Sequence, residues 1–118
     1  MFPPSTLASV YVKGSLKNTD DGFEFALRNN IESTMLSGIG PIVVGEQTYS
    51  GAAITVAVGG RVWQGDQVGW RNPVPASVGT TMEVRVQGEQ LPAGPVRLAV
   101  TAASTDIGSV TFEVTDTV

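Results

Sequence analysis

Residues Thr80–Thr115 read TTMEVRVQGEQLPAGPVRLAVTAASTDIGSVTFEVT, and this stretch decides the fold of the chain. Apolar and polar residues alternate in three of its runs, and a period of two places alternate side chains on opposite faces of a β-strand. Glycine and proline interrupt the alternation between the runs, as is typical of connections. The pattern therefore predicts three antiparallel strands with one face in the core and one in water. The three runs are 82–87, 96–101 and 110–115. Together with the alternating run 23–28 they predict nine core residues: Phe23, Phe25, Leu27, Val84, Val86, Leu98, Val100, Phe112 and Val114.

Further short strands are expected toward the N-terminus, again separated by turn-forming residues. The glycine pairs and acidic-glycine steps between them favour tight hairpins. The expected strands are Leu7–Lys13, Phe23–Arg28, Ile42–Val44, Thr48–Ser50, Ala53–Val58, Arg61–Gln64 and a short one around Gln67–Trp70, with turns at Leu16–Gly22, Gly45-Glu46 and Gly59-Gly60. Because Pro73 and Pro75 would break a central strand, the piece around Gln67–Trp70 is expected at an edge or in a loop.

The composition supports the same class. The chain has 17 valines, 12 threonines and 5 isoleucines but only 6 leucines, and β-branched residues favour strands over helices. Eight or nine strands at a spacing of about 8–12 residues are typical of a two-sheet sandwich. We therefore expect an all-β chain of 118 residues that forms one domain over residues 1–118, a two-sheet antiparallel β-sandwich of the immunoglobulin or jelly-roll kind.

Several classes of function are excluded or disfavoured by composition. The chain has no cysteine and no histidine, so it has no disulfide, no Cys or His metal site and no Ser-His-Asp triad. The net charge is −4 and the seven basic residues are scattered, which disfavours nucleic acid. No apolar run approaches the ~20 residues of a membrane span, and Met1-Phe2-Pro3-Pro4 does not read as a signal peptide. A cytoplasmic protein that does not enter the membrane is expected.

Three polar or glycine-rich motifs have ordinary structural interpretations. Residues 18–21 could hold a hard cation, but Asx residues before a glycine are usual turn formers. Residues 38–41, Gly-Ile-Gly-Pro, lack the Lys-Ser/Thr pair of a phosphate loop and favour a bend into a strand. Glu24, Glu83 and Glu113 could pair as glycosidase carboxylates, but outward charges beside arginines indicate cross-strand ion pairs. No residue is proposed as catalytic.

Both tryptophans fall in one glycine-rich segment, and this segment carries the candidate site. Trp63 and Trp70 precede Arg71 and Pro73, and tryptophan and arginine are enriched at interface hot spots. One tryptophan could instead belong to the core while the other caps the sandwich, and a tryptophan could also stack on a sugar as a ligand platform. We predict that the functional surface lies at Trp63–Pro75, as a partner interface or a ligand platform.

Two phrases near the N-terminus resemble a known family. Residues 12–18, Val-Lys-Gly-Ser-Leu-Lys-Asn, and residues 22–28, Gly-Phe-Glu-Phe-Ala-Leu-Arg, resemble the opening of the small β subunits of C-glycoside deglycosidases. The resemblance implies a β-sandwich that binds a larger TIM-barrel α subunit of the xylose-isomerase-like kind. That subunit would hold a divalent metal and the bases that cleave 3-oxo-C-glycosides, a carbon–carbon lyase reaction of carbohydrate metabolism. No cofactor would belong to this chain.

Two hypotheses for function follow. In the first, the chain is a non-catalytic accessory subunit of such a C-glycoside deglycosidase-like complex. In the second, it is a self-assembling β-sandwich with a structural, small-ligand or carbohydrate-binding role. Whether the chain is an enzyme is left open, with catalysis by the chain alone the third choice. Because only 15 % of the residues are charged, few charges keep sandwich faces and edges apart, and a homo-oligomer or hetero-complex is expected.

Overall fold

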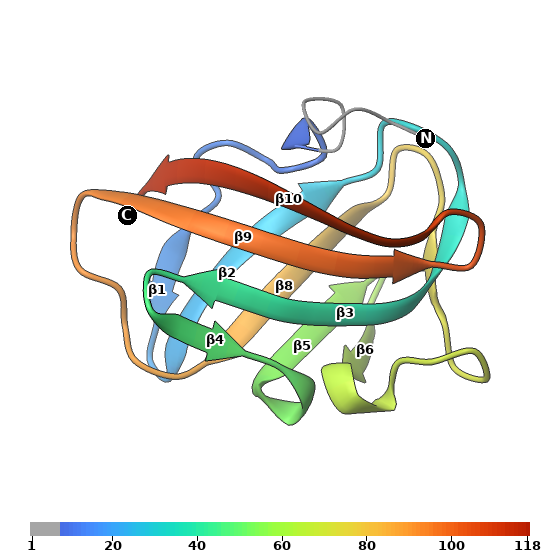
Figure 1. The fold of residues 1–118 in the computed structure, drawn as a ribbon, viewed down its shortest axis with the longest axis horizontal. Coiled ribbons are helices and arrows are strands. Elements are labelled where there is room, and N and C mark those ends of the chain that lie inside the picture. Colours follow the sequence, from blue (N-terminus) through green and yellow to red (C-terminus); the bar gives the residue numbers. More distant parts are fainter. Residues whose placement is uncertain (1–7) are drawn as a thin grey trace.

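Two antiparallel β-sheets face each other in the computed structural model, which describes residues 8–118 (Figure 1). The first sheet has the order β1 (Lys17–Thr19), β2 (Gly22–Arg28), β8 (Thr81–Gln87), β5 (Ile54–Val58) and β6 (Arg61–Gln64). The second has the order β10 (Gly108–Thr117), β9 (Pro95–Ser104), β3 (Thr34–Val44) and β4 (Gln47–Tyr49), and β7 (Val74–Ala76) also pairs with β3. The expected all-β, two-sheet antiparallel sandwich is confirmed.

The core lies between the sheets and is built from the alternating positions. In β8, Met82, Val84 and Val86 are buried while the residues between them are exposed. Eight of the nine residues expected in the core are buried, and Val114 is only half-buried. Its strand, β10, ends the second sheet and pairs with β9 alone, so its apolar side chains are covered less completely. The eight are Phe23, Phe25, Leu27, Val84, Val86, Leu98, Val100 and Phe112.

Local turn chemistry locates the hairpins correctly. Val44 pairs with Gln47 around Gly45-Glu46, and Val58 pairs with Arg61 around Gly59-Gly60. The polar turn expected at residues 16–22 is shorter than predicted, because residues 17–19 already form β1 and only Asp20-Asp21 turn. Gly22 is required there, since a Cβ at this position would overlap the carbonyl oxygen of Val86.

Strand β3 is much longer than the predicted Ile42–Val44. It begins at Thr34 and runs through residues 38–41, which interrupt the sequence pattern but not the strand. Its register against β9 shifts between Leu36 and Gly38 and again between Ile39 and Ile42. Such irregularities bend a strand without ending it, so the glycines and Pro41 are local bends in a continuous element. The bend expected for this motif is found.

Two predicted strands are wrong. Within residues 8–13 only Tyr11 forms a bridge, to Leu27, and residues 9, 10 and 13 lie in turns. Backbone hydrogen bonds from Val12 to Ala26 at 3.0 Å and from Arg28 to Val10 at 2.7 Å flank this bridge, but no strand is formed. Leu7 and Met1–Pro4 lie outside the described residues. The expected strand at Gln67–Trp70 is also absent from the described chain, because Gly65–Gln67 forms the short 3-10 helix η2 and a tight turn follows. The described residues form ten strands rather than the eight or nine expected. Two of them, β1 and β7, were not predicted, because each is only three residues long and shows no clear alternation.

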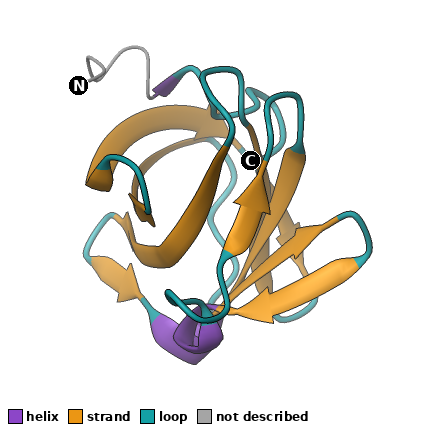
Figure 2. Cartoon of the chain, turned by 90° about the vertical axis from the view of Figure 1, so that its right-hand side faces the viewer, coloured by secondary structure: helices purple, strands orange, loops and turns teal. Residues whose placement is uncertain are grey.

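The chain changes sheet at short connections. The 3-10 helix η1 (Gly51–Ala53) leads from β4 to β5, and η2 leads from β6 toward β7. Figure 2 shows these helical turns together at one edge of the sandwich. Strands β8 and β9 follow each other in the sequence yet belong to opposite sheets, so residues 88–94 cross from one layer to the other. Pro75 lies in β7, a strand that the sequence pattern did not predict and that pairs with β3 outside the main strand order. The piece around Gln67–Trp70 lies in a loop, one of the two positions expected for it.

Candidate functional site

The two tryptophans of the predicted surface have opposite environments. Trp63 lies on β6 opposite Val56 and is only 3 % exposed, so it belongs to the core. The guanidinium carbon of Arg61 lies 4.6 Å from the centre of its ring, a cation–π distance. For Trp63 the core interpretation is therefore the one that the structure supports.

Trp70 and Arg71 occupy the tip of a tight turn, here called the Trp70 turn (residues 69–72). The backbone N–H of Gly69 donates to the carbonyl of Asn72 at 3.3 Å, and the N–H of Asn72 donates back at 3.1 Å. The side-chain amide of Asn72 donates to the carbonyl of Gln67 at 3.1 Å and ties the turn to η2. Trp70 is 75 % exposed at this tip. Three hydrogen bonds therefore present a tryptophan and an arginine to solvent on an ordered backbone.

The structure brings together two of the four predicted site residues. Trp70 and Arg71 are adjacent and exposed, and Pro73 is half-buried where the chain enters β7. Trp63 stands apart in the core. Nothing in the sequence pattern alone separates the two tryptophans, because both follow a glycine-rich stretch.

The acidic motifs take structural roles. Thr19 donates to Asp21 at 3.2 Å within the β1–β2 turn, as expected of a turn former. Among the described residues, no group of His, Cys, Asp or Glu has the arrangement of a metal site. The cross-strand ion pairs expected for the glutamates are not the contacts seen, because Arg85 pairs at 3.9 Å with Glu83 of its own strand.

A buried carboxylate that the sequence analysis did not single out joins the two ends of the described chain. Asp116 on β10 is 4 % exposed, and its Oδ2 accepts from the Tyr11 hydroxyl at 2.7 Å, from the N–H of Gly14 at 2.9 Å and from the N–H of Leu16 at 3.4 Å. Oδ1 accepts from the N–H of Thr117 at 2.8 Å. Burial alone would raise the pKa of Asp116, but these hydrogen bonds outweigh it and hold the pKa below its usual value.

Tyr11 should make stability fall at alkaline pH. Burial and the hydrogen bond to Asp116 raise the pKa of its phenol, so the native state holds this proton more tightly than the unfolded chain. The contribution is fully present below the ordinary tyrosine pKa of about 10 and is lost as pH rises toward the higher native pKa. Urea unfolding from pH 8 to pH 11 should show a steeper loss for the unmodified protein than for Tyr11→Phe. Tyr49→Phe, which keeps Tyr11, should retain the steep loss.

A second feature that the sequence analysis missed is a cavity at one end of the sandwich, between the two sheets. Asn29 and Glu32 of the β2–β3 connection and Asp106 of the β9–β10 turn lie at its mouth. These residues stand in short polar stretches that read as ordinary turns, so no sequence signal marked them.

No helix among residues 8–118 combines the length and the apolar character that crossing a bilayer requires. The expectation of a cytoplasmic protein remains a prediction.

Comparison with known families corrects the proposed resemblance. Residues 6–118 match the family described as Hydroxymethylglutaryl-CoA reductase, N-terminal domain. This is a different family from the β subunits of C-glycoside deglycosidases, so the earlier assignment is wrong, and the deglycosidase, lyase and carbohydrate roles drawn from it are unsupported. No curated protein matches the chain.

The structure explains why the N-terminal phrases were a poor guide to family. Ser15 accepts from the N–H of Ala26 at 3.0 Å and donates to the carbonyl of Val12, while Leu16 is buried. Gly22 lets β2 approach β8 closely. These residues stabilise the edge of the first sheet around β1 and β2. Such a structural role does not by itself indicate a family, because unrelated proteins share the sandwich fold. On the match across nearly its whole length, the chain belongs to the hydroxymethylglutaryl-CoA reductase N-terminal domain family.

Proposed function

We propose that this chain is a non-catalytic β-sandwich module that docks through the Trp70 turn against a catalytic reductase domain. The observation that carries the proposal is a tryptophan 75 % exposed at the tip of a hydrogen-bonded turn. A large aromatic side chain buries 150–250 Å² when it is covered, so an exposed one leaves apolar surface that a partner can remove from water. The family to which the chain belongs, an N-terminal domain of a reductase, suggests the partner.

The geometry of the turn favours tight contact. Its backbone is already ordered by the reciprocal hydrogen bonds of Gly69 and Asn72, so docking costs little additional conformational entropy. Arg71, the next residue in the chain, adds a planar cation, and tryptophan and arginine are both enriched at interface hot spots. The partner surface that fits is an apolar pocket with an acidic rim. The absence of histidine and cysteine from the sequence agrees with chemistry that resides in the partner.

The proposal predicts that Trp70→Ala weakens docking at least tenfold, because hot-spot truncations cost about 2 kcal/mol or more. The chain would be titrated against the catalytic domain of a hydroxymethylglutaryl-CoA reductase and complex formation followed by sedimentation velocity and by the rate of hydroxymethylglutaryl-CoA reduction. Val78→Ala is the matched control, since Val78 is another apolar side chain more than half exposed, at 56 %. It should leave affinity unchanged, as should Glu113→Ala on β10.

Trp70→Ala should also leave the unfolding free energy unchanged, since the indole has little of its surface covered by the chain. No complex with the reductase domain, or a complex equally strong with Trp70→Ala, would refute docking through this turn. Loss of stability in the isolated Trp70→Ala chain would instead assign the tryptophan to the fold.

Self-assembly is the second candidate, and the edge of the second sheet favours it. Strand β10 is ten residues long and pairs with β9 on one side only. A long edge strand offers unpaired backbone groups to another copy, and the low charged fraction of 15 % provides little repulsion. Light scattering of the chain alone decides between the two: a monomer without the reductase domain favours hetero-docking, and a concentration-dependent dimer favours self-assembly.

A further inference from the structure

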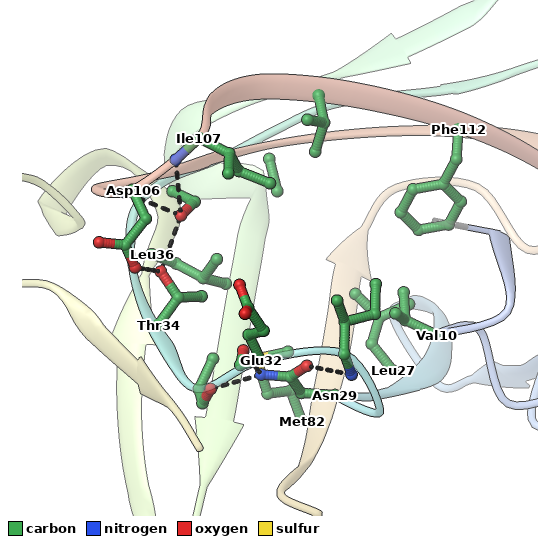
Figure 3. Close-up of a pocket in the computed structure, with 15 residues that line it drawn as sticks. Val10, Leu27, Asn29, Glu32, Thr34, Leu36, Met82, Asp106, Ile107 and Phe112 are labelled. Carbon is green, nitrogen blue, oxygen red and sulfur yellow. Dashed lines mark hydrogen bonds between the residues drawn. The ribbon is translucent and has the colours of Figure 1, made fainter. Parts of the chain in front are cut away.

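The cavity at the end of the sandwich is enclosed mainly by apolar side chains from both sheets (Figure 3). Its volume is about 110 Å³. An engineered apolar cavity of about 150 Å³ binds benzene, so this somewhat smaller space, which is open at its mouth, suits a short alkyl chain or a similar apolar group. The inner wall is formed by Leu27, Met82, Leu36, Ala102 and Phe112.

The mouth of the cavity carries carboxylates and is held in place by hydrogen bonds. The Asn29 side-chain amide is 7 % exposed and donates to the carbonyls of Glu32 and Ala76 at 2.7 Å and 2.5 Å, while its oxygen accepts from the N–H of Ile31 at 3.1 Å. These bonds fix the β2–β3 connection. Glu32 stands on this connection at the rim, and in Figure 3 its carboxylate lies on the cavity side.

The opposite side of the mouth has a second, oriented carboxylate. The Thr34 hydroxyl donates to Asp106 Oδ2 at 2.5 Å and lies 2.7 Å from the Ser104 hydroxyl. Ser104 in turn accepts from the N–H groups of Asp106 and Ile107 at 3.1 Å and 3.4 Å. Because Thr34 donates to the carboxylate, the Ser104 hydroxyl donates to Thr34. This chain of hydrogen bonds holds the Asp106 carboxylate through its Oδ2, and Asp106 is exposed.

The negative charges at the mouth of the cavity favour a cationic ligand. Among the described residues that line the cavity, none is a lysine or an arginine, whereas Glu32 and Asp106 both contribute a negative charge. An anionic head group, such as a carboxylate or a phosphate, would be repelled there. A protonated amine would be attracted mainly by the Glu32 carboxylate, which lies on the cavity side in Figure 3, and in addition by the negative charge of Asp106, while its apolar part fills the cavity. We propose that this cavity is a binding site for a small amphipathic amine, a function separate from docking through the Trp70 turn.

The test compares three probes with the same six-carbon chain: n-hexylamine, 1-hexanol and hexanoate. The full-length chain would carry ¹³C-labelled methionine methyl groups. Met82 is 5 % exposed and lines the cavity, whereas Met35 is 39 % exposed and does not line it. We expect the Met82 signal to shift saturably with hexylamine while the Met35 signal stays in place. Hexylamine should bind about two- to fivefold more tightly than hexanol, as exposed ion pairs allow, and hexanoate more weakly than either.

Variants locate the head-group and apolar contacts separately. Glu32→Gln should remove most of the two- to fivefold preference for the amine and leave hexanol binding unchanged. Glu113→Gln, an exposed carboxylate on β10 away from the cavity lining, should leave the preference intact and controls for overall charge. Val110→Phe or Ala102→Leu should fill the cavity and weaken all three probes at least fivefold, with a melting curve confirming that each variant is folded. Trp70→Ala should bind hexylamine as the unmodified chain does.

Three results would overturn the inference. If Met82 does not shift, or shifts without saturation, the cavity binds no such molecule. If the three probes bind equally, the cavity is an apolar space without a head-group site. If folded Val110→Phe and Ala102→Leu bind hexylamine normally, the amine binds elsewhere.

Discussion

Replacing Phe25 with alanine is expected to lower the free energy of unfolding by about 3–5 kcal/mol, the usual range for a buried phenylalanine. Phe25 is 1 % exposed and lies on β2, a strand paired on both sides. Its cross-strand partner on β8 is Val84, which is fully buried. Its ring centre lies 5.7 Å from that of Tyr11, so truncation also removes an aromatic contact. The loss would be measured by urea unfolding at neutral pH.

Phe112→Ala is the matched comparison for this prediction. Phe112 is 5 % exposed and borders the end cavity, so part of its surroundings is already empty space. Its removal enlarges an existing opening that water can enter, and the expected loss is smaller than that of Phe25→Ala. Equal losses for the two variants would contradict the conclusion that Phe25 is more completely packed than Phe112.

Asp116→Ala is expected to cost about 3 kcal/mol, because it removes one acceptor shared by several buried donors. The Tyr11 hydroxyl and the N–H groups of Gly14 and Leu16 would all lose their partner, and Tyr11 and Leu16 are themselves buried. These bonds span about one hundred residues of sequence, so they anchor the N-terminal described segment against β10. Asp116→Asn, which keeps an acceptor oxygen, should cost less. Glu113→Ala, an exposed carboxylate of the same strand, should cost nothing measurable.

The Asp116 carboxylate should also make the free energy of unfolding fall at acid pH. The pKa of Asp116 is lower in the native state than its usual value, so the native state releases this proton more readily than the unfolded chain. Its contribution is present above the unfolded pKa of about 3.9 and is lost as pH falls through the lower native pKa. Urea unfolding between pH 7 and pH 2 should show a smaller acid loss for Asp116→Asn than for the unmodified protein. Parallel profiles for the two would contradict this assignment.

Local patterns in the sequence were sufficient for much of the fold. The alternation in residues 82–87, 96–101 and 110–115 predicted β8, β9 and β10, because a period of two is a property of each strand by itself. The turns at Gly45-Glu46 and Gly59-Gly60 were found for the same reason, since a two-residue hairpin depends on its own backbone conformation. The class of fold follows from these elements, because half-apolar strands must bury one face against another sheet.

Where the local pattern was broken, the prediction failed. Residues 34–41 belong to β3, but their glycines and Pro41 remove the alternation that marks a strand. Only pairing with β9 and β7 keeps this segment extended. Residues 8–13 show the converse, because an apolar run with strand-forming residues pairs with β2 only around Tyr11, through hydrogen bonds of Val12 with Ala26 and of Val10 with Arg28. The rest of this run does not continue as a strand.

The candidate sites depended on the tertiary structure. The sequence determined that Trp70 and Arg71 are adjacent and that two tryptophans share a segment, but only the packing of β6 buries Trp63 and leaves Trp70 exposed. Glu32 and Asp106 both line the cavity, although they lie 74 residues apart in the chain. Alternation of apolar and polar residues predicts which face of a strand is apolar. It does not predict which strands become neighbours or where a cavity remains between the two sheets. Those arrangements arise from contacts between distant segments, and a single sequence carries no local signal for them.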